Sequence, residues 1–158
     1  FNSIFPELID RTEKFNNIIS RNTIKNMSSE YIAFNDDFIG IRIVSVGRLS
    51  NQKGFDIAIR VCRKLLDRGY NIRWYVIGEG KEYKNLLNDI EKSRLRDNFI
   101  LMGLRDNPYP YINEADIYVQ PSRHEGYCLT LAEARCLNKP IVTTNFAENS
   151  FLMTVRAV

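Results

Sequence analysis

The stretch that decides the fold, residues 39–69, reads IGIRIVSVGRLSNQKGFDIAIRVCRKLLDRG. Residues 39–46 form a short run rich in Ile and Val, which is typical of a buried strand. Residues 54–69 carry apolar side chains at helical spacing, and Gly69 suits the left-handed position that follows a helix. The stretch therefore predicts a strand, a turn and a helix.

The same alternation of strand and helix patterns continues to residue 144. Further strands are predicted at residues 72–77, 98–102, 116–120 and 141–144, and helices at residues 83–90, 110–114 and 128–137. Parallel strands need crossover connections and read as near-continuous apolar runs, so the predicted fold class is α/β, a doubly wound, Rossmann-like parallel sheet. In the common strand order 3-2-1-4-5, the loops after the first and fourth strands meet where ligands bind.

Residues 1–38 do not follow this alternation. Ile18 and Ile19 could form a strand, and residues 22–30 a short helix. We interpret residues 1–38 as a lead-in or linker, and residues 39–158 as the main domain. Within the latter, residues 145–158 contain no strand-turn-helix pattern.

Length, composition and charge indicate which kind of protein this is. A chain of 158 residues, 44% of them hydrophobic, is long enough for one domain with its own core. The net charge of +3 is small and the charges are interleaved, which does not favour nucleic acid as a partner. No apolar run approaches the ~20 residues of a membrane-spanning helix, so we expect a soluble domain, with docking at a membrane surface left open.

The three cysteines, Cys62, Cys128 and Cys136, are an odd number and form no Cys-x-x-Cys pair. This usage favours a reducing, cytoplasmic setting. His124 is the only histidine, and the sequence contains neither a P-loop nor an Asp-x-Asp motif. We therefore expect no divalent metal and no cofactor.

Two cations, Arg48 and Lys53, lie in the loop after the first strand, with Gly54 at the mouth of the helix. Arginine offers a fork of donors to phosphate oxygens, and lysine a compact point charge. The alternative is a solvated loop in which both side chains face water.

Two carboxylates, Glu125 and Glu133, follow the fourth strand. If a helix begins near Cys128, its free amides form an anion site, and Glu133 lies on the same face as Thr130. An elongated ligand could place an anionic group at the helix mouth, hydroxyls on Glu133 and a further polar group at Glu125. The alternative makes Glu133 a surface residue and Glu125 a charge that complements the helix dipole.

Four motifs occur in a fixed order: VGRL at 46–49 with KGFD at 53–56, VIGEG at 76–80, QPS at 120–122 with EG at 125–126, and LAEA at 131–134. Together they resemble the C-terminal, donor-binding domain of retaining GT-B glycosyltransferases, the group called family four or group 1. Glu125 and Glu133, with seven residues between them, match the paired glutamates of that family. The resemblance covers residues 39–144.

The resemblance implies a role for each matched residue. Arg48 and Lys53 would hold the diphosphate of a sugar nucleotide and stabilise charge on the leaving group. Glu125 would contact the donor sugar, Glu133 would bond the ribose hydroxyls, and the base would lie near residues 103–105. The remaining donor-binding residues would be Gly47, Gly126, Tyr127, Cys128, Leu129 and Thr130.

The resemblance also implies a retaining hexosyltransferase that uses a nucleoside diphosphate sugar, with UDP as the expected nucleotide. The acceptor would be a glycan or a lipid-linked molecule in bacterial polysaccharide or cell-surface glycan biosynthesis. An N-terminal acceptor-binding domain would complete the enzyme, which could associate peripherally with the inner face of the membrane. Residues 1–38 would then be the end of that domain with the interdomain linker, and residues 39–158 the donor-binding domain. Two alternatives remain open: a non-catalytic nucleotide-binding α/β module, and a GT-B-like epimerase or phosphorylase.

The sequence departs from the family at three places. Cys128 and Asn138 stand where members often have glycine, although Asn tolerates the left-handed conformation. The final strand and helices of the family, which follow the position of Asn145, are not recognisable here.

Overall fold

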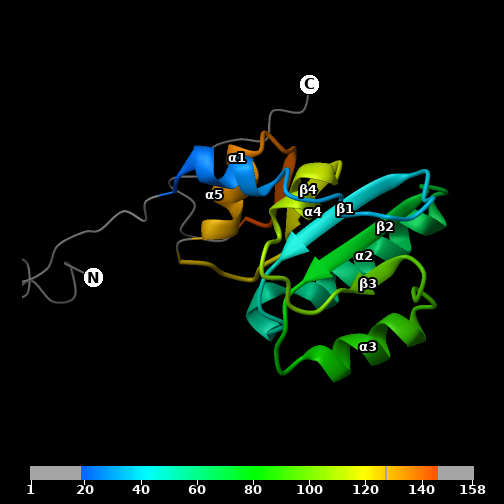
Figure 1. The fold of residues 1–158 in the computed structure, drawn as a ribbon. Helices are drawn as coiled ribbons and strands as arrows, with labels where there is room; N and C mark the ends of the chain where they lie inside the picture. The colour runs from blue at the N-terminus through cyan, green and yellow to red at the C-terminus, as the bar shows by residue number, and fades with distance from the viewer. Residues whose placement is uncertain (1–18, 127, 146–158) are drawn as a thin grey trace, which may run out of the picture.

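The computed structural model describes residues 19–126 and 128–145, which build one five-stranded parallel sheet (Figure 1). The strand order is β3-β2-β1-β4-β5, so the predicted class and the predicted order are both confirmed. The strands are β1 (Ile41–Val46), β2 (Ile72–Ile77), β3 (Phe99–Leu101), β4 (Ile117–Gln120) and β5 (Ile141–Thr143).

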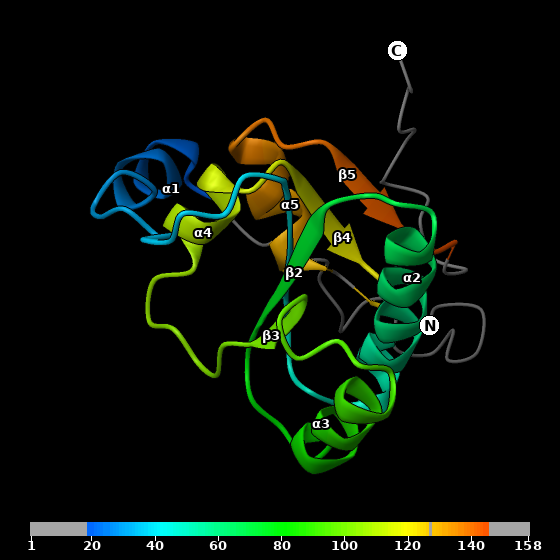
Figure 2. The ribbon, with the colours of Figure 1, turned by 90° about the vertical axis from the view of Figure 1, so that its right-hand side faces the viewer.

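Helices cover both faces of the sheet (Figure 2). One face carries α2 (Phe55–Asp67) and α3 (Tyr83–Lys92), and a short 3-10 helix, η2 (Asn51–Lys53), precedes α2. The other face carries α1 (Arg21–Met27), α4 (Tyr109–Glu114) and α5 (Leu129–Cys136). This is the doubly wound arrangement that right-handed crossovers produce.

Alternate residues of the central strands divide the core into two halves, because successive strand side chains point to opposite faces. Ile43, Trp74 and Val76 pack with Phe55 and Cys62 on the α2 side. Val44, Tyr75 and Ile77 pack on the other side with buried residues of β4, α4 and α5, namely Tyr111, Ile112, Tyr118, Leu131 and Ala134.

Two helices end as the sequence predicts. Gly69 has φ +83°, and the next amide, that of Tyr70, bonds the carbonyl of Leu65 at 3.2 Å. Asn138 has φ +54°, and the amide of Lys139 bonds the carbonyl of Ala134 at 3.1 Å. Asn138 therefore replaces glycine as the left-handed cap of α5.

The segment before β1 differs from the prediction at one point. Ile19 is not part of a strand: it directly precedes Ser20, the N-cap of α1, and its side chain packs against the core beside α5. Ile18 lies outside the described residues. The short helix predicted at residues 22–30 is α1, which begins one residue earlier and ends at Met27. Ser28 is its C-cap, and the hydroxyl of Ser28 donates to the carbonyl of Lys25 at 2.8 Å.

Residues 28–40 run across the sheet and are tied to it by polar contacts. Glu114 accepts hydrogen bonds from the backbone amides of Ala33 and Phe34 at 2.8 and 3.1 Å. Asp36 pairs with Arg42 of β1 and with Arg73 of β2. The described part of residues 1–38 is therefore packed onto the domain.

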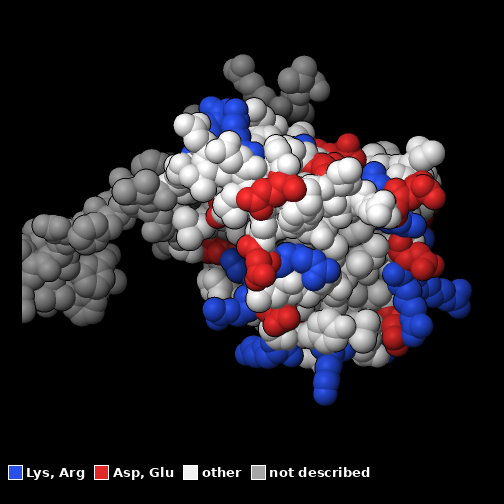
Figure 3. Space-filling view, viewed as in Figure 1, with Lys and Arg blue, Asp and Glu red and all other residues white. Residues whose placement is uncertain are grey.

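Charges are spread over the surface. On the face shown in Figure 3, Lys and Arg side chains alternate with Asp and Glu. Among the described residues, no helix combines the length and the apolar character that a membrane span requires.

Candidate functional site

Two loops meet at the carboxyl end of the sheet, because β1 and β4 are neighbours. The amide of Arg123 bonds the carbonyl of Gln52 at 2.8 Å, and the side-chain amide of Gln52 bonds the carbonyl of His124 at 3.1 Å. The guanidinium of Arg123 also binds both carboxylate oxygens of Asp56 at 2.8 Å, which lowers the pKa of Asp56. The loops are thus held together, as expected for a switch point.

Gly54 allows this close approach. It has φ +68°, and a Cβ atom at this position would overlap the carbonyl oxygen of Pro121 in the other loop. Only glycine satisfies both the conformation and the space, so the glycine at the mouth of α2 is required by the second loop.

Lys53 and Glu125 join the loops by a buried ion pair. The Nζ atom of Lys53 lies 2.6 Å from Oε1 of Glu125, a residue that is only 8% exposed. The hydroxyl of Ser122 and the side-chain amide of Gln120 donate to the same oxygen at 2.5 and 3.2 Å. Within the described residues no hydrogen bond engages Oε2, so this second oxygen can accept from a ligand.

Gln120 connects the pair to the start of α5. Its amide nitrogen donates to Ser122 at 2.8 Å, and its oxygen accepts from the hydroxyls of Tyr118 at 2.7 Å and Thr130 at 3.4 Å. Gln120 and Tyr118 are fully buried, so this network is shielded from water and holds the second loop in one arrangement.

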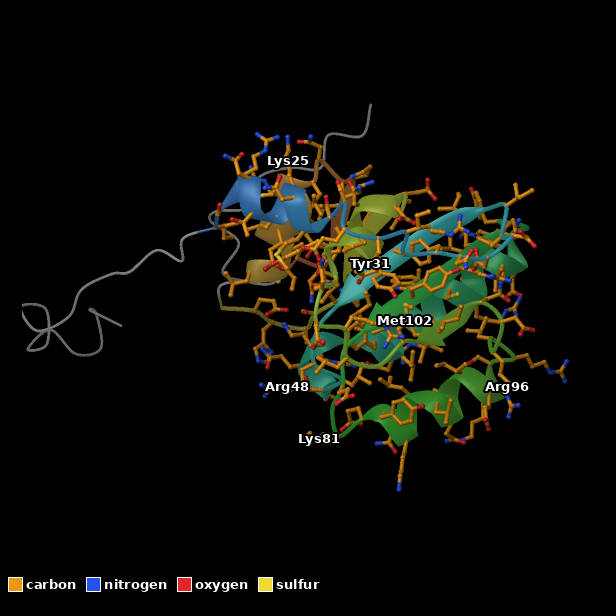
Figure 4. All side chains as sticks on the ribbon, in the orientation of Figure 1. Lys25, Tyr31, Arg48, Lys81, Arg96 and Met102 are labelled. Carbon is orange, nitrogen blue, oxygen red and sulfur yellow. The ribbon has the colours of Figure 1, made fainter. Side chains whose placement is uncertain are left out.

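A pocket of about 740 Å³ opens beside the pair and is lined by Arg48, Ser50, Asn51, Gln52, Lys53 and Lys81. Figure 4 shows Arg48 and Lys81 at this same end of the sheet. Among the described residues neither has an ion-pair partner, whereas the charge of Lys53 is offset by Glu125. The pocket therefore presents uncompensated positive charge and is of a size that holds small ligands.

The first turn of α5 directly follows the loop that carries Glu125. The N-cap is Cys128, which is buried and caps no amide with its side chain; burial raises the pKa of its thiol. Leu129 and Gly126 are exposed, and Thr130 is half-buried. The amides of this turn have no intrahelical partners and are available to an anion. Tyr127 lies outside the described residues.

Glu133 lies one turn further along α5 and is half-buried. Its Oε1 accepts a hydrogen bond from the hydroxyl of Tyr109 in α4 at 3.1 Å. Burial raises the pKa of Glu133, and the bond from Tyr109 offsets part of that rise. Burial, and then the charge of Glu133, raise the pKa of Tyr109 to about 12. Glu133 is therefore held by α4 and is not a freely solvated surface residue.

The structure thus brings the sequence-predicted residues to one edge of the sheet. Arg48 and Lys53 line one pocket, and Glu125 contacts Lys53. Gly47, at the end of β1, bonds the carbonyl of Ile77 at 2.9 Å. The loop at residues 103–105 follows β3 at the same edge, where the carbonyl of Gly103 accepts from Gly78 at 2.9 Å.

Sequence reasoning missed Lys81, Arg123 and Tyr109. Lys81 could have been found, because it follows β2 at the same edge in the Gly-Glu-Gly-Lys run. Within residues 19–126 and 128–145, no group of three or more His, Cys, Asp or Glu side chains is placed to hold a metal ion.

Comparison with known families decides the identity of the chain. The family model described as "Glycosyl transferases group 1" matches residues 39–151. The chain belongs to the glycosyl transferases group 1 family. Its four ordered motifs all fall within the matched residues.

Several named members of this glycosyltransferase family are similar in sequence. An uncharacterized glycosyltransferase of Methanocaldococcus jannaschii is 29% identical over 150 residues, 90% of this chain and 36% of the relative. The O-antigen biosynthesis glycosyltransferase WclY of Escherichia coli is 30% identical over 132 residues, 83% of this chain and 36% of the relative. The chain thus spans about a third of the length of these relatives.

Solved structures share the fold of this group 1 glycosyltransferase chain. Staphylococcus aureus TarM, in a complex that contains UDP, matches 93% of this chain and 29% of its own with a TM-score of 0.68 at 18% identity. Anabaena HepE, in complex with UDP and glucose, matches 73% of this chain and 32% of its own with a TM-score of 0.67 at 20% identity. These likenesses confirm the α/β fold.

Proposed function

We propose that the chain is the C-terminal, donor-binding domain of a retaining hexosyltransferase that uses a nucleoside diphosphate sugar. The observation that carries the proposal is the pocket lined by Arg48 and Lys53, in which Lys53 is bonded to Glu125 of the second loop. The second of the paired glutamates, Glu133, lies further along α5, the helix that follows this loop. Membership of the group 1 family supports a transferase.

The diphosphate is assigned to the pocket. Arg48 is exposed and offers its guanidinium fork to phosphate oxygens, while Lys53 adds a charge that it shares with Glu125. When the bond to the sugar breaks, negative charge builds up on the departing diphosphate, and cations already fixed there stabilise it. In this proposal the two side chains supply that stabilisation without a divalent metal or a cofactor.

The sugar and the ribose are assigned to the two glutamates. Glu125 keeps one oxygen on Lys53 and turns the other to the donor sugar. Glu133 follows Glu125 by eight residues, four of them within the first part of α5, where each residue advances the chain by only about 1.5 Å. A single nucleotide sugar is assigned to both carboxylates. The backbone from Gly47 and from Gly126 to Thr130 completes the cradle, and the base lies toward residues 103–105.

UDP is the nucleotide we propose, because the structures of TarM and HepE that share the fold contain it. The remaining two thirds of a full-length relative leave room for an acceptor-binding domain. The name of WclY refers to O-antigen biosynthesis, which supports a glycan or lipid-linked acceptor in polysaccharide biosynthesis. We place the enzyme in the cytoplasm, since the cysteines of this chain are free thiols, as is usual in a reducing compartment. Peripheral association with the inner face of the membrane is part of the proposal and would bring the enzyme to a lipid-linked acceptor.

Calorimetric titration of the chain with UDP tests the assignment of the pocket. Arg48→Ala removes an exposed cation with no ion-pair partner among the described residues, so the fold is retained. We expect the Kd for UDP to rise at least about tenfold, the effect of losing one charge-assisted contact. Lys64→Ala, which removes an exposed cation of α2 outside the pocket, is the matched control. Equal affinities of the two variants would contradict the phosphate role.

Retention is tested separately on the full-length enzyme. The anomeric proton of the first product, followed by NMR before any mutarotation, is expected to show the configuration of the donor. A product of inverted configuration would overturn the retaining mechanism. Release of an epimer without transfer would replace the proposal by the GT-B-like epimerase.

A further inference from the structure

The carboxylate assigned to the ribose is held in place by another helix. The hydroxyl of Tyr109 in α4 donates to Oε1 of Glu133 in α5 at 3.1 Å, across 24 residues of sequence. This is the one hydrogen bond to the Glu133 side chain within the described residues. A glutamate on a helix otherwise has several rotamers, so a donor fixed at Oε1 selects one of them and leaves Oε2 for a ligand.

Tyr109 is itself fixed at the start of α4. Its backbone amide donates to Oδ1 of Asn107 at 3.1 Å, and its side chain is half-buried against the core. Pro108 precedes it and Pro110 follows it, which restricts the backbone on both sides. The hydroxyl therefore has little freedom to leave Glu133.

Asn107 extends these contacts to the segment before the sheet. It is buried, and its side-chain amide donates to the carbonyl of Met27 and to Oε2 of Glu30, each at 2.8 Å. The backbone carbonyl of Asn107 accepts a hydrogen bond from the hydroxyl of Tyr31. Tyr31, labelled in Figure 4, follows α1 in the chain. A continuous series of contacts thus runs from the end of α1 through Asn107 and Tyr109 to Glu133.

We propose that Tyr109 is a positioning residue for Glu133 and that it sets the discrimination between ribose and 2′-deoxyribose in the bound nucleotide. The inference rests on the proposed function, which assigns the ribose hydroxyls to Glu133. A carboxylate held in one rotamer accepts from both vicinal hydroxyls without losing side-chain freedom on binding, whereas an untethered one must be ordered by the ligand. Losing the tether therefore weakens contacts to the ribose and leaves contacts to the phosphates unchanged.

The experiment compares three probes on the chain: UDP, 2′-deoxy-UDP and inorganic pyrophosphate. Tyr109→Phe removes only the hydroxyl. We expect its Kd for UDP to rise about fivefold, the size of one modest hydrogen bond. The rise should be smaller for 2′-deoxy-UDP, which keeps only the 3′ hydroxyl, and absent for pyrophosphate, which has no ribose. Tyr111→Phe is the matched control, because Tyr111 belongs to the same helix and its hydroxyl has no hydrogen bond to Glu133.

A double-variant cycle separates positioning from packing. If Tyr109 acts through Glu133, adding Tyr109→Phe to Glu133→Gln costs no further affinity for UDP. Thermal unfolding of each variant shows whether the fold is retained. Tyr109→Phe removes only the hydroxyl, so the double variant keeps the packing of the aromatic ring.

The possible failures are distinguishable. If Glu133→Gln binds UDP as tightly as the parent chain, the ribose assignment fails and this inference with it. If Glu133→Gln loses affinity but Tyr109→Phe behaves as Tyr111→Phe does, the proposed function stands and the positioning role of Tyr109 is overturned. Equal losses of UDP and pyrophosphate in Tyr109→Phe would also overturn it, since they indicate a general structural effect.

Discussion

Lys53 and Glu125, which come from loops 72 residues apart, form an ion pair of 2.6 Å at the point where those loops meet. Two neutral donors, Ser122 and Gln120, bind the same carboxylate oxygen. The pair thus stabilises the loop arrangement, and it also holds beside the pocket a cation that we assign to the donor diphosphate. A binding group in this position is fixed before the ligand arrives.

Removing one partner of this pair is expected to destabilise the fold more than removing both charges. Lys53→Met leaves the buried carboxylate without its cation, and we expect a loss of about 2 kcal/mol in the free energy of unfolding. Lys53→Met with Glu125→Gln leaves no uncompensated charge and should lose less. Urea unfolding of both variants measures the difference, and a larger loss in the double variant would show that the pair is not the source of the effect.

Gly54 and Gly69 flank α2 and both have positive φ, but only Gly54 lies against another loop. We expect Gly69→Ala, with open space around it, to cost about 1 kcal/mol for the left-handed backbone alone. Gly54→Ala adds the overlap with the carbonyl of Pro121, so we expect about 3 kcal/mol and a weaker affinity for UDP. Urea unfolding measures the loss of stability in each variant, and calorimetry measures the affinity for UDP. Equal losses of stability in Gly54→Ala and Gly69→Ala would mean that the two loops separate without strain.

The sheet and its order could be predicted because each element carries its own signal. Periodicity in residues 39–69 marks the first strand and helix, and the order 3-2-1-4-5 is the common one for a doubly wound parallel sheet. The strand order predicts that the loops carrying Lys53 and Glu125 lie together, since β1 and β4 are neighbours, but not that these two side chains form an ion pair. The resemblance to the family supplied the roles that we propose for these residues.

Contacts between elements that are distant in sequence could not be predicted. Tyr109 is one of eight tyrosines, and nothing in its surroundings shows that it reaches α5. Ile19 has the β-branched character of a strand residue, but it lies directly before Ser20, the N-cap of α1, and belongs to no strand. Asp36 likewise has no local signal, since its partners Arg42 and Arg73 are brought together only by the pairing of β1 with β2.

Asp36 is expected to contribute stability that depends on pH. Burial alone would raise the pKa of Asp36, but hydrogen bonds, foremost from Arg42, outweigh it and lower the pKa below its ordinary value of 3.8. The folded state therefore favours the carboxylate, so this contribution is present above pH 3.8 and is lost as the pH falls through the lower folded value. We expect Asp36→Asn to cost about 1 kcal/mol at pH 7 and less at pH 3.

Urea unfolding at the two pH values measures this difference. Asp37→Asn is the control, because Asp37 has no ion pair within the described residues. A loss in Asp36→Asn that does not change between pH 7 and pH 3 would show that packing, and not charge, attaches this segment to the sheet.

Glu133 is expected to show the opposite dependence. Burial raises its pKa above the ordinary value of 4.5, so the folded state binds the proton more tightly than the unfolded chain does. The resulting stability is fully present below pH 4.5 and is lost as the pH rises through the raised folded value, where the carboxylate becomes charged in a half-buried position. Glutamine carries no such charge, so the free energy of unfolding of Glu133→Gln should increase relative to the parent chain between pH 4 and pH 7.

Urea unfolding across this pH range measures the difference in unfolding free energy between Glu133→Gln and the parent chain. A constant difference would mean that Tyr109 fully compensates the burial of the carboxylate. An increase would identify Glu133 as a residue that lowers stability at neutral pH, as expected where a buried charge is kept for a ligand.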